Sequence, residues 1–266
     1  MAFPKWGVCT NFLGNDAYSL HMDAFPRLAE RFSYIELPAM TVAELSEADF
    51  AALTEAAGAC SARFPVMTNF FSAQFPLLSP GLDRGALKAY LERLLPRCQA
   101  LGCKALVLGS GKARSLQSGQ SREDGYRILS RLLNQTVLPL CQKHGVGIII
   151  EPLNPKLTDF MLDLWEGREL ARRCEGEVSL LADSLHLMAH PEIERELEEN
   201  GSWITHVHLS EENRAAPGEP LSPQMARFLA GLRAIGYDGP ASFECHMEDP
   251  GVMEGAKQAA ARALGA

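Results

Sequence analysis

The chain has 266 residues, of which 47% are hydrophobic and 22% are charged. This apolar fraction is enough for a large core and excludes an intrinsically disordered chain. The net charge of −8, from 25 basic and 33 acidic residues, argues against a partner held through phosphate neutralisation. We therefore expect no nucleic acid among its partners.

The N-terminal region and the cysteines bear on location. The longest charge-free run, residues 65–82, is interrupted by Pro76 and Pro80 and is too polar to cross a bilayer. Residues 1–6 lack the apolar core of a secretory signal. The seven cysteines are odd in number and form no Cys-x-x-Cys pair, a pattern typical of free thiols in a reducing compartment. We expect a cytoplasmic protein without a membrane partner.

Short strand-like runs alternate with longer helical segments from one end of the chain to the other. Several of the runs are continuously apolar, which is typical of parallel strands covered on both faces. In chain order the expected strands are Gly7–Thr10, Tyr34–Leu37, Pro65–Thr68, Ala105–Leu108, Gly147–Ile150, Ser179–Ala182, Thr205–Leu209 and Ala241–Phe243.

The intervening segments show a helical period. Apolar residues form one stripe in each of the segments 84–101, 122–144 and 223–235, which indicates amphipathic helices. The sequence Ser46-Glu47-Ala48-Asp49 is typical of a helix start, and glycines at 102, 145 and 236 are placed to end helices.

Eight strand–helix units without a linker predict a single (β/α)8 barrel domain over residues 1–266. The alternative is an open doubly wound sheet, which usually has a glycine-rich dinucleotide turn after an early strand. Residues 9–14 do not supply such a turn, and we expect no organic cofactor.

The ends of the last four expected strands carry a carboxylate or an imidazole. These residues are Glu151, Asp183, His208 and Glu244. The C-terminal strand ends of a barrel surround its active site, and a carboxylate placed there must be paired or bound to a metal. Three carboxylates and one imidazole favour one divalent ion, Mn²⁺ or Mg²⁺, over a thiolate-type zinc site. The alternative is that each residue caps a helix or forms an ordinary ion pair.

Four segments carry a resemblance to a known family. Residues 151–154 (EPLN), 183–186 (DSLH), 206–214 (HVHLSEENR) and 242–244 (SFE) resemble the xylose-isomerase-like barrels. The match is to the sugar isomerase/epimerase branch that includes D-tagatose and D-psicose 3-epimerases. The resemblance implies that the four strand-end residues bind one divalent metal, usually Mn²⁺, with Co²⁺ or Zn²⁺ as further alternatives.

The same resemblance assigns roles to individual residues. It implies that Glu151 and Glu244 also form the proton-transfer pair, and that His186 and Arg214 hold substrate oxygens. Asn154 is present as in the epimerases and is expected to bind substrate. Leu157 stands where the epimerase pattern has a substrate-contacting glutamate, so the chain departs from the pattern there.

These features predict a metal-dependent isomerase or epimerase of a small carbohydrate. Proton transfer next to a carbonyl needs a base and a stabilised enediolate oxygen, and a divalent cation lowers the energy of that anion. A dehydratase acting on a keto-polyol such as an inosose starts from the same enediolate and is an alternative. A sugar-binding module without activity is another. A multi-zinc apurinic-site endonuclease is disfavoured, because strands three and four do not end in histidine.

Other polar residues near the strand ends leave alternatives open. Glu36 contacts substrate or forms an ion pair at the barrel mouth, and His206 lies one layer below His208 because both face the same side of their strand. Basic residues at 112, 114 and 156 either hold an anionic group of the substrate or point to solvent. A monomer and a homo-oligomer formed through the outer helices both stay open.

Overall fold

The strands form one closed parallel barrel. The computed structural model describes residues 5–14, 18–247, 251 and 253–265. Each strand pairs in parallel with the next along the chain, and β8 closes the ring on β1. The strands are β1 (Trp6–Cys9), β2 (Tyr34–Pro38), β3 (Val66–Thr68), β4 (Ala105–Leu108), β5 (Gly147–Ile150), β6 (Val178–Asp183), β7 (Ile204–Leu209) and β8 (Ala241–Phe243).

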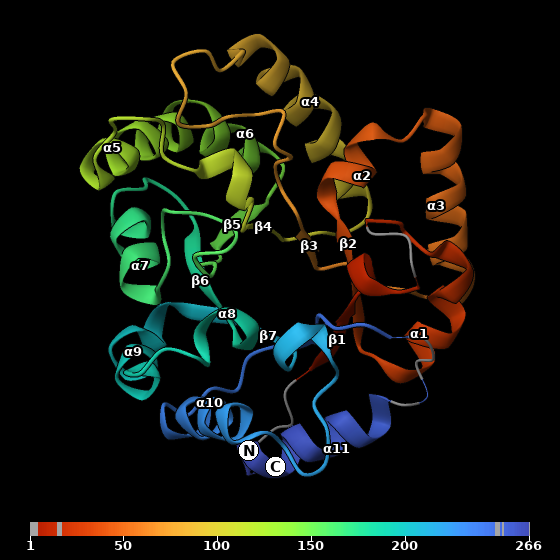
Figure 1. Ribbon diagram of the computed structural model, residues 1–266. Coiled ribbons are helices and arrows are strands. Elements are labelled where there is room, and N and C mark those ends of the chain that lie inside the picture. The colour runs from red at the N-terminus through yellow and green to blue at the C-terminus, as the bar shows by residue number, and fades with distance from the viewer. Residues whose placement is uncertain (1–4, 15–17, 248–250, 252, 266) are drawn as a thin grey trace.

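Helices surround this ring, as Figure 1 shows in a view into the barrel. They are α1 (Phe25–Arg31), α2 (Ala39–Glu44), α3 (Glu47–Cys60), α4 (Arg84–Ala100), α5 (Arg122–Leu132), α6 (Leu138–Lys143), α7 (Leu164–Arg172), α8 (Ser184–Leu187), α9 (Ile193–Asn200), α10 (Pro223–Ala234) and α11 (Met253–Leu264). The architecture is a (β/α)8 barrel, which confirms the predicted fold class and excludes the open sheet. The single domain over residues 1–266 stays a prediction, since residues 1–4 and 266 lie outside the described part.

Local sequence signals account for most element boundaries. Ser46 accepts a hydrogen bond from the backbone N–H of Asp49 and so caps α3, as its sequence predicts. The glycines at 102, 145 and 236 have φ of 73°, 65° and 68° and follow α4, α6 and α10. A positive φ costs glycine little, so these positions end the helices before the next strand.

The predicted helix over 122–144 is divided in the structure. It consists of α5, a π-helical stretch over Leu133–Val137, and α6. Pro139 lies in the first turn of α6 and has no N–H to donate to the carbonyl of Gln135. The π-helical stretch immediately before α6 accommodates that missing bond, whereas a period of 3.6 alone predicts one uninterrupted helix.

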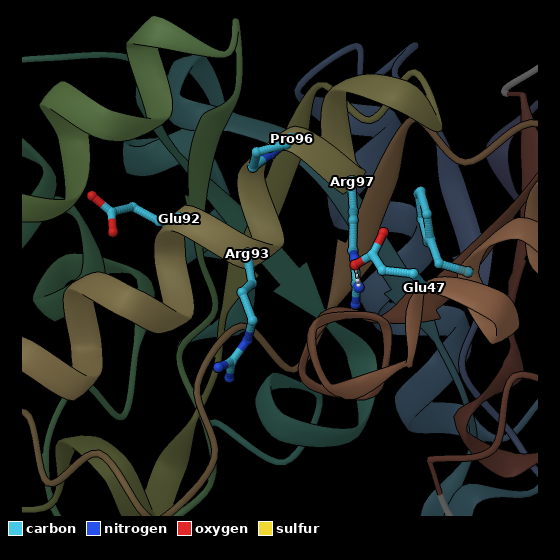
Figure 2. Close-up of a pocket in the computed structure, with 6 residues that line it drawn as sticks. Glu47, Glu92, Arg93, Pro96 and Arg97 are labelled. Atoms are coloured by element: carbon cyan, nitrogen blue, oxygen red, sulfur yellow. Dashed lines mark hydrogen bonds and ion pairs between the residues drawn. The ribbon is translucent and has the colours of Figure 1, made fainter.

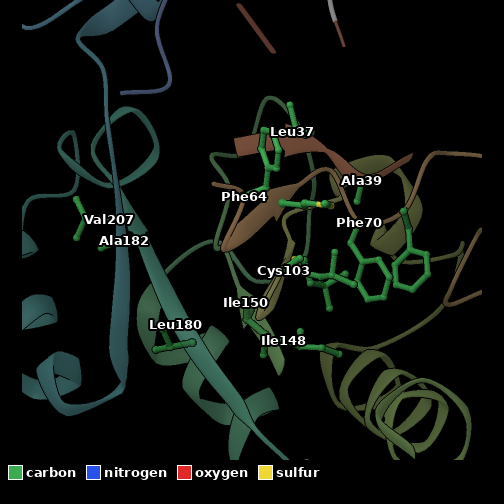
Figure 3. Close-up of a cluster of buried hydrophobic side chains, with 14 of the residues drawn as sticks. Leu37, Ala39, Phe64, Phe70, Cys103, Ile148, Ile150, Leu180, Ala182 and Val207 are labelled. Carbon is green, nitrogen blue, oxygen red and sulfur yellow. The ribbon is translucent and has the colours of Figure 1, made fainter. Parts of the chain in front are cut away.

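The outward faces of the strands and the helices share the main core. Figure 3 shows part of it, where Ile148 and Ile150 of β5 lie near Leu180 of β6 and Phe70. All four side chains are buried. Because both faces of each strand are covered, the strands read as continuous apolar runs.

The inward faces form a separate, smaller layer. Its apolar members are Val66, Val107, Ile149 and Leu181, one from each of β3 to β6. Side chains of a strand alternate between its two faces, so Glu151 and Asp183, two residues beyond Ile149 and Leu181, also face inward. The barrel geometry therefore directs these two carboxylates to the C-terminal mouth.

Candidate metal centre

The four strand-end residues predicted as ligands converge at the mouth. Glu151, Asp183, His208 and Glu244 each offer one ligand atom, and these atoms all lie within 4.8 Å of one another. All four residues are buried, with Asp183 and His208 fully so. They come from four consecutive strands, and the parallel pairing of β5 to β8 brings the C-terminal ends of these strands to the same end of the barrel.

Glycine makes room for the first carboxylate. A Cβ built on Gly109, just after β4, would lie 2.2 Å from Oε2 of Glu151. Any larger residue at 109 would therefore displace the carboxylate itself. Asp183 is fixed differently: its Oδ1 accepts the backbone N–H of Leu185 at 2.7 Å and so caps the short helix α8, leaving Oδ2 toward the cluster.

His186 points a hydrogen-bond donor into the cluster. The side-chain amide of Asn154 lies 2.9 Å from its Nδ1 and donates to it, which places the imidazole proton on Nε2. That Nε2 is buried, has no hydrogen-bond partner, and lies 3.6 Å from Asp183 Oδ2 and 3.9 Å from Glu151 Oε1. Burial lowers the pKa of His186, which favours the neutral imidazole.

Arg214, which follows β7 in the chain, contacts two of the clustered carboxylates. Its guanidinium donates to Asp183 Oδ2 at 3.3 Å and forms a shorter bond with Glu244 Oε2. The ring of Phe12 lies beneath it, 4.7 Å from the guanidinium carbon to the ring centroid. The structure thus places Arg214 against two of the predicted ligands.

The neighbouring carboxyl groups of Glu151 and Glu244 have their pKa values shifted in opposite directions. Burial and the neighbouring Glu244 raise the pKa of Glu151 to about 8. Burial opposes ionisation of Glu244 too, but Arg214 and His208 outweigh it and hold the pKa of Glu244 well below its usual range. Burial likewise opposes the charged form of His208, yet its ionisable neighbours, Cys9 and Glu36 foremost, raise its pKa.

The donor set fits a divalent cation. Three carboxylates and one imidazole suit Mn²⁺ or Mg²⁺ better than a soft ion. Nδ1 of His208 is buried and has no hydrogen-bond partner, although it lies 3.6 Å from Glu244 Oε2 and 3.9 Å from Glu151 Oε1. An unpartnered imidazole nitrogen facing two carboxylates is what a cation would bind.

Glu36 and His206 lie below the cluster. Glu36 has no exposed surface, and its Oε1 and Oε2 accept from His206 Nε2 at 2.7 Å and His208 Nε2 at 3.2 Å. Burial opposes ionisation of Glu36, but the two imidazoles outweigh it and lower its pKa. The structure thus shows Glu36 hydrogen-bonded to two imidazoles, and contact of Glu36 with substrate stays a prediction. His206 lies one layer below His208, as expected.

Asn11 is a site residue that the sequence did not single out. It follows β1, is 3% exposed, and its side-chain amide donates to Asn69 Oδ1 at 2.7 Å and toward Glu244 Oε1 at 3.3 Å. It thereby helps to hold Glu244. The available signal was a polar residue at the end of β1, facing inward two positions beyond Cys9.

The three basic residues predicted near the mouth differ in their exposure to solvent. Arg114 is fully buried and donates to the backbone carbonyls of Gly109, Phe160 and Glu151. Both alternatives predicted for Arg114, a bond to a substrate anion and exposure to solvent, are therefore wrong. Its guanidinium donates hydrogen bonds to loop carbonyls that receive none from a strand or a helix. Lys112 and Lys156 are exposed.

A hollow on the outer surface lies away from this cluster. It sits between α3 and α4, where Arg97 pairs with Glu47 at 2.5 Å (Figure 2). The guanidinium of Arg97 is already bonded to the carbonyls of Val42, Ala43 and Leu45 at the end of α2. These bonds indicate a structural role for Arg97.

None of the helices in the described part of the chain has the length and the hydropathy of a membrane-spanning segment.

Comparison with solved structures shows the same barrel in several proteins. A D-psicose 3-epimerase from Clostridium cellulolyticum H10, solved with D-tagatose, is 19% identical with a TM-score of 0.77, and the match covers 98% of this chain and 97% of that chain. A 3-keto-D-glucoside 4-epimerase from E. coli is 18% identical with a TM-score of 0.72, covering 99% of this chain and 100% of that chain.

The shared fold also extends to a different class of protein. An AP endonuclease of family 2 from Brucella melitensis is 17% identical with a TM-score of 0.64, covering 93% of this chain and 95% of that chain. At these identities the likeness establishes architecture only. No curated protein sequence matches the chain. The model of the xylose isomerase-like TIM barrel family matches residues 26–264. The chain therefore belongs to the xylose isomerase-like TIM barrel family.

Proposed function

We propose that this protein is a divalent-metal-dependent isomerase or epimerase that moves a proton at the carbon next to a carbonyl of a sugar or sugar derivative. The observation that carries the proposal is the cluster of Glu151, Asp183, His208 and Glu244, with all four ligand atoms within 4.8 Å and buried at the barrel mouth. Such a convergence of charge is costly without a cation to bind.

The four clustered residues would hold one ion, for which Mn²⁺ is the first choice. The bound ion would polarise the substrate carbonyl and lower the energy of the enediolate formed when the neighbouring proton leaves. Glu151 and Glu244 would remove and return that proton. Epimerisation or isomerisation follows from the carbon to which the proton is returned.

The residues around the cluster would orient the substrate. His186 presents its unpartnered Nε2–H to the cluster and would donate to a substrate oxygen, while Asn154 keeps the imidazole in that tautomer. Arg214 would stabilise negative charge developing on a second oxygen. The epimerases among the structural neighbours act on sugars by their names, which supports a carbohydrate as the substrate class.

The endonuclease alternative lacks the residues it needs. Three-zinc chemistry requires histidines after β3 and β4, and this chain has Thr68-Asn69 and Gly109-Ser110 there. Dehydration of a keto-polyol begins with the same proton removal and remains the second candidate, since the same carboxylate pair supports it. A non-catalytic sugar-binding module is the third.

All seven cysteines are free, which supports the proposed cytoplasmic location.

The test is exchange of a substrate C–H proton with D₂O, followed by NMR in the presence of Mn²⁺. The panel contains neutral keto-sugars, sugar acids, sugar phosphates, an inosose and hydroxypyruvate. At Mn²⁺ concentrations that saturate each variant, we expect exchange by the wild type on at least one carbohydrate, at least about 100-fold slower exchange by Glu151→Gln, and binding of the substrate by both. Glu92→Gln, on the exposed surface of α4, is the matched control and should exchange as the wild type does.

The outcomes separate the candidates. Exchange with return of the proton supports the isomerase or epimerase, loss of water supports the dehydratase, and binding without either supports the sugar-binding module. The panel also tests the exposed Lys112 and Lys156. Preference for acidic or phosphorylated substrates would support their role in binding an anion, and preference for neutral sugars would contradict it.

A further inference from the structure

The inner face of the barrel is polar on one side only. Below the cluster, β3 to β6 contribute an apolar layer, whereas β2, β7 and β8 contribute Tyr34, Glu36, His206 and Ser242. These four side chains are buried, three of them with no exposed surface and Tyr34 with 4%. Polar groups in such a place are retained only where they are bonded to one another.

The hydrogen bonds of this group all run toward Glu36. Oε1 accepts from His206 Nε2 at 2.7 Å and, over a shorter distance, from the hydroxyl of Ser242. Oε2 accepts from His208 Nε2 at 3.2 Å. The Tyr34 hydroxyl, 2.8 Å from Ser242 Oγ, donates to it because the single Ser242 proton is used on Glu36.

The local sequence makes space for this arrangement. A Cβ built on Gly7 of β1 would lie 2.1 Å from the Tyr34 ring and 2.5 Å from Ser242 Oγ. A side chain at that inward position would therefore expel the two hydroxyls that support Glu36. Glycine is therefore needed at position 7 to leave space for the polar side chains in the barrel interior, and not to form a turn.

The orientation of His208 follows from its bond to Glu36. Donation from Nε2 places the proton on that nitrogen and leaves Nδ1 for the cluster. Nδ1 is buried, unpartnered, and faces Glu151 and Glu244 at 3.9 and 3.6 Å. A ring flip would turn a nitrogen away from the cluster and break the bond to Glu36.

We propose that Glu36 is a positioning residue for the divalent ion: it fixes the tautomer and ring orientation of His208, makes Nδ1 the ligand atom, and thereby sets the affinity of the cluster for the ion. The inference rests on the metal centre of the proposed function and deepens it. Carboxylates that accept from a ligand histidine raise its basicity, and their loss costs about 10- to 100-fold in metal affinity.

A second ion among Glu36, His206 and His208 is the competing explanation, since these residues also offer atoms within 4.8 Å of one another. The distances of 2.7 and 3.2 Å from the two imidazole nitrogens to Glu36 are those of N–H donors to a carboxylate. The nitrogens of His206 and His208 that contact Glu36 are thus already used as hydrogen-bond donors, although Nδ1 of His206 is buried without a partner. A hydrogen-bonded support accounts for the contacts with Glu36.

The experiment compares two buried glutamates. Glu196 on α9 is also fully buried and also bonded to a histidine, His190, but belongs to the outer helices. Mn²⁺ affinity is measured by titration calorimetry for the wild type, Glu36→Gln and Glu196→Gln, with the melting temperature of each. A glutamine at position 36 would offer only one acceptor oxygen to several donors, so we expect about 10- to 100-fold weaker Mn²⁺ binding. Glu196→Gln should lose stability without losing Mn²⁺ affinity.

The outcomes distinguish this inference from the function on which it rests. If the wild type binds Mn²⁺ and Glu36→Gln binds it equally well, the role of Glu36 is overturned while the metal centre stands. If the wild type binds no divalent ion, both fall. If Glu36→Gln does not fold, ¹⁵N–¹H NMR of the Zn²⁺-loaded wild type decides. His208 should show a protonated Nε2 and a metal-bound Nδ1, and the opposite pattern overturns the proposal.

Discussion

A single methyl group added at Gly109 would change the geometry of the candidate metal centre. A Cβ there meets Oε2 of Glu151 at 2.2 Å and no backbone atom within the same distance. We therefore expect Gly109→Ala to fold but to push the Glu151 carboxylate out of the cluster. Mn²⁺ affinity, measured by titration calorimetry, should fall about tenfold or more.

The control for that substitution is another glycine. A Cβ on Gly58 of α3 would have no atom within 4 Å, and alanine is the better helix former there. Gly58→Ala should leave Mn²⁺ affinity unchanged and raise the melting temperature slightly. Equal Mn²⁺ affinities for the two alanine variants would show that Glu151 does not need the space beside Gly109.

Which site residues were predictable depended on their backbone. Glu151, Asp183, His208 and Glu244 lie in or directly after strands, where the period of two and the position at a strand end are visible in the sequence. Arg114 ends a 3₁₀ helix (Gly111–Arg114) between β4 and α5 that is too short to show a period, and its side chain turns inward to bind carbonyls. Its role depends on contacts with residues far along the chain.

At the scale of elements, α7 and α9 are joined by one buried carboxylate. Glu196 accepts the backbone N–H of Leu164 at the start of α7 and lies 2.9 Å from His190 Nδ1. The hydrogen bond to Glu196 raises the pKa of His190, against the effect of partial burial and with a contribution from Asp163. A raised pKa in the folded state means that the folded protein binds the His190 proton more tightly than the unfolded chain does.

The stabilisation is therefore complete below the unfolded pKa of histidine and is lost as the pH rises through the raised value. Glu196→Gln should lower the free energy of unfolding more at about pH 5.5 than at about pH 8.5, by up to about 1 kcal/mol since His190 is partly exposed. Urea denaturation at both pH values measures it. Glu198→Gln, exposed on the same helix, should show no such difference. The same loss at both pH values would refute the linkage.

Element boundaries were predictable where the local signal is strong. The strand β4 has the predicted bounds, because its apolar run is flanked by breaks in pattern. The division between α5 and α6 was not predicted, since the apolar stripe continues through it. Only the geometry imposed by Pro139 and the fit against the barrel show where the ladder of hydrogen bonds changes.

At the scale of the whole molecule, buried charge is concentrated at one end of the barrel axis. The apolar layer of β3 to β6 fills one side of the interior, and the polar group around Glu36 supports the other side beneath the cluster. The acidic cluster thus lies above an interior that is packed on one side and hydrogen-bonded on the other. Sequence alone predicted the cluster and the place of His206 below it, but the bonds from His206 and Ser242 to Glu36 depend on which strands become neighbours when the ring closes.

The most direct test is the stoichiometry of bound metal. The protein is incubated with excess Mn²⁺, freed of unbound ion by gel filtration, and assayed by elemental analysis beside Asp183→Asn and the exposed-surface control Glu92→Gln. We expect about one ion per chain for the wild type and the control, and far less for Asp183→Asn. Retention of no divalent ion by the wild type, or equal retention by Asp183→Asn, would contradict a shared ion at the barrel mouth.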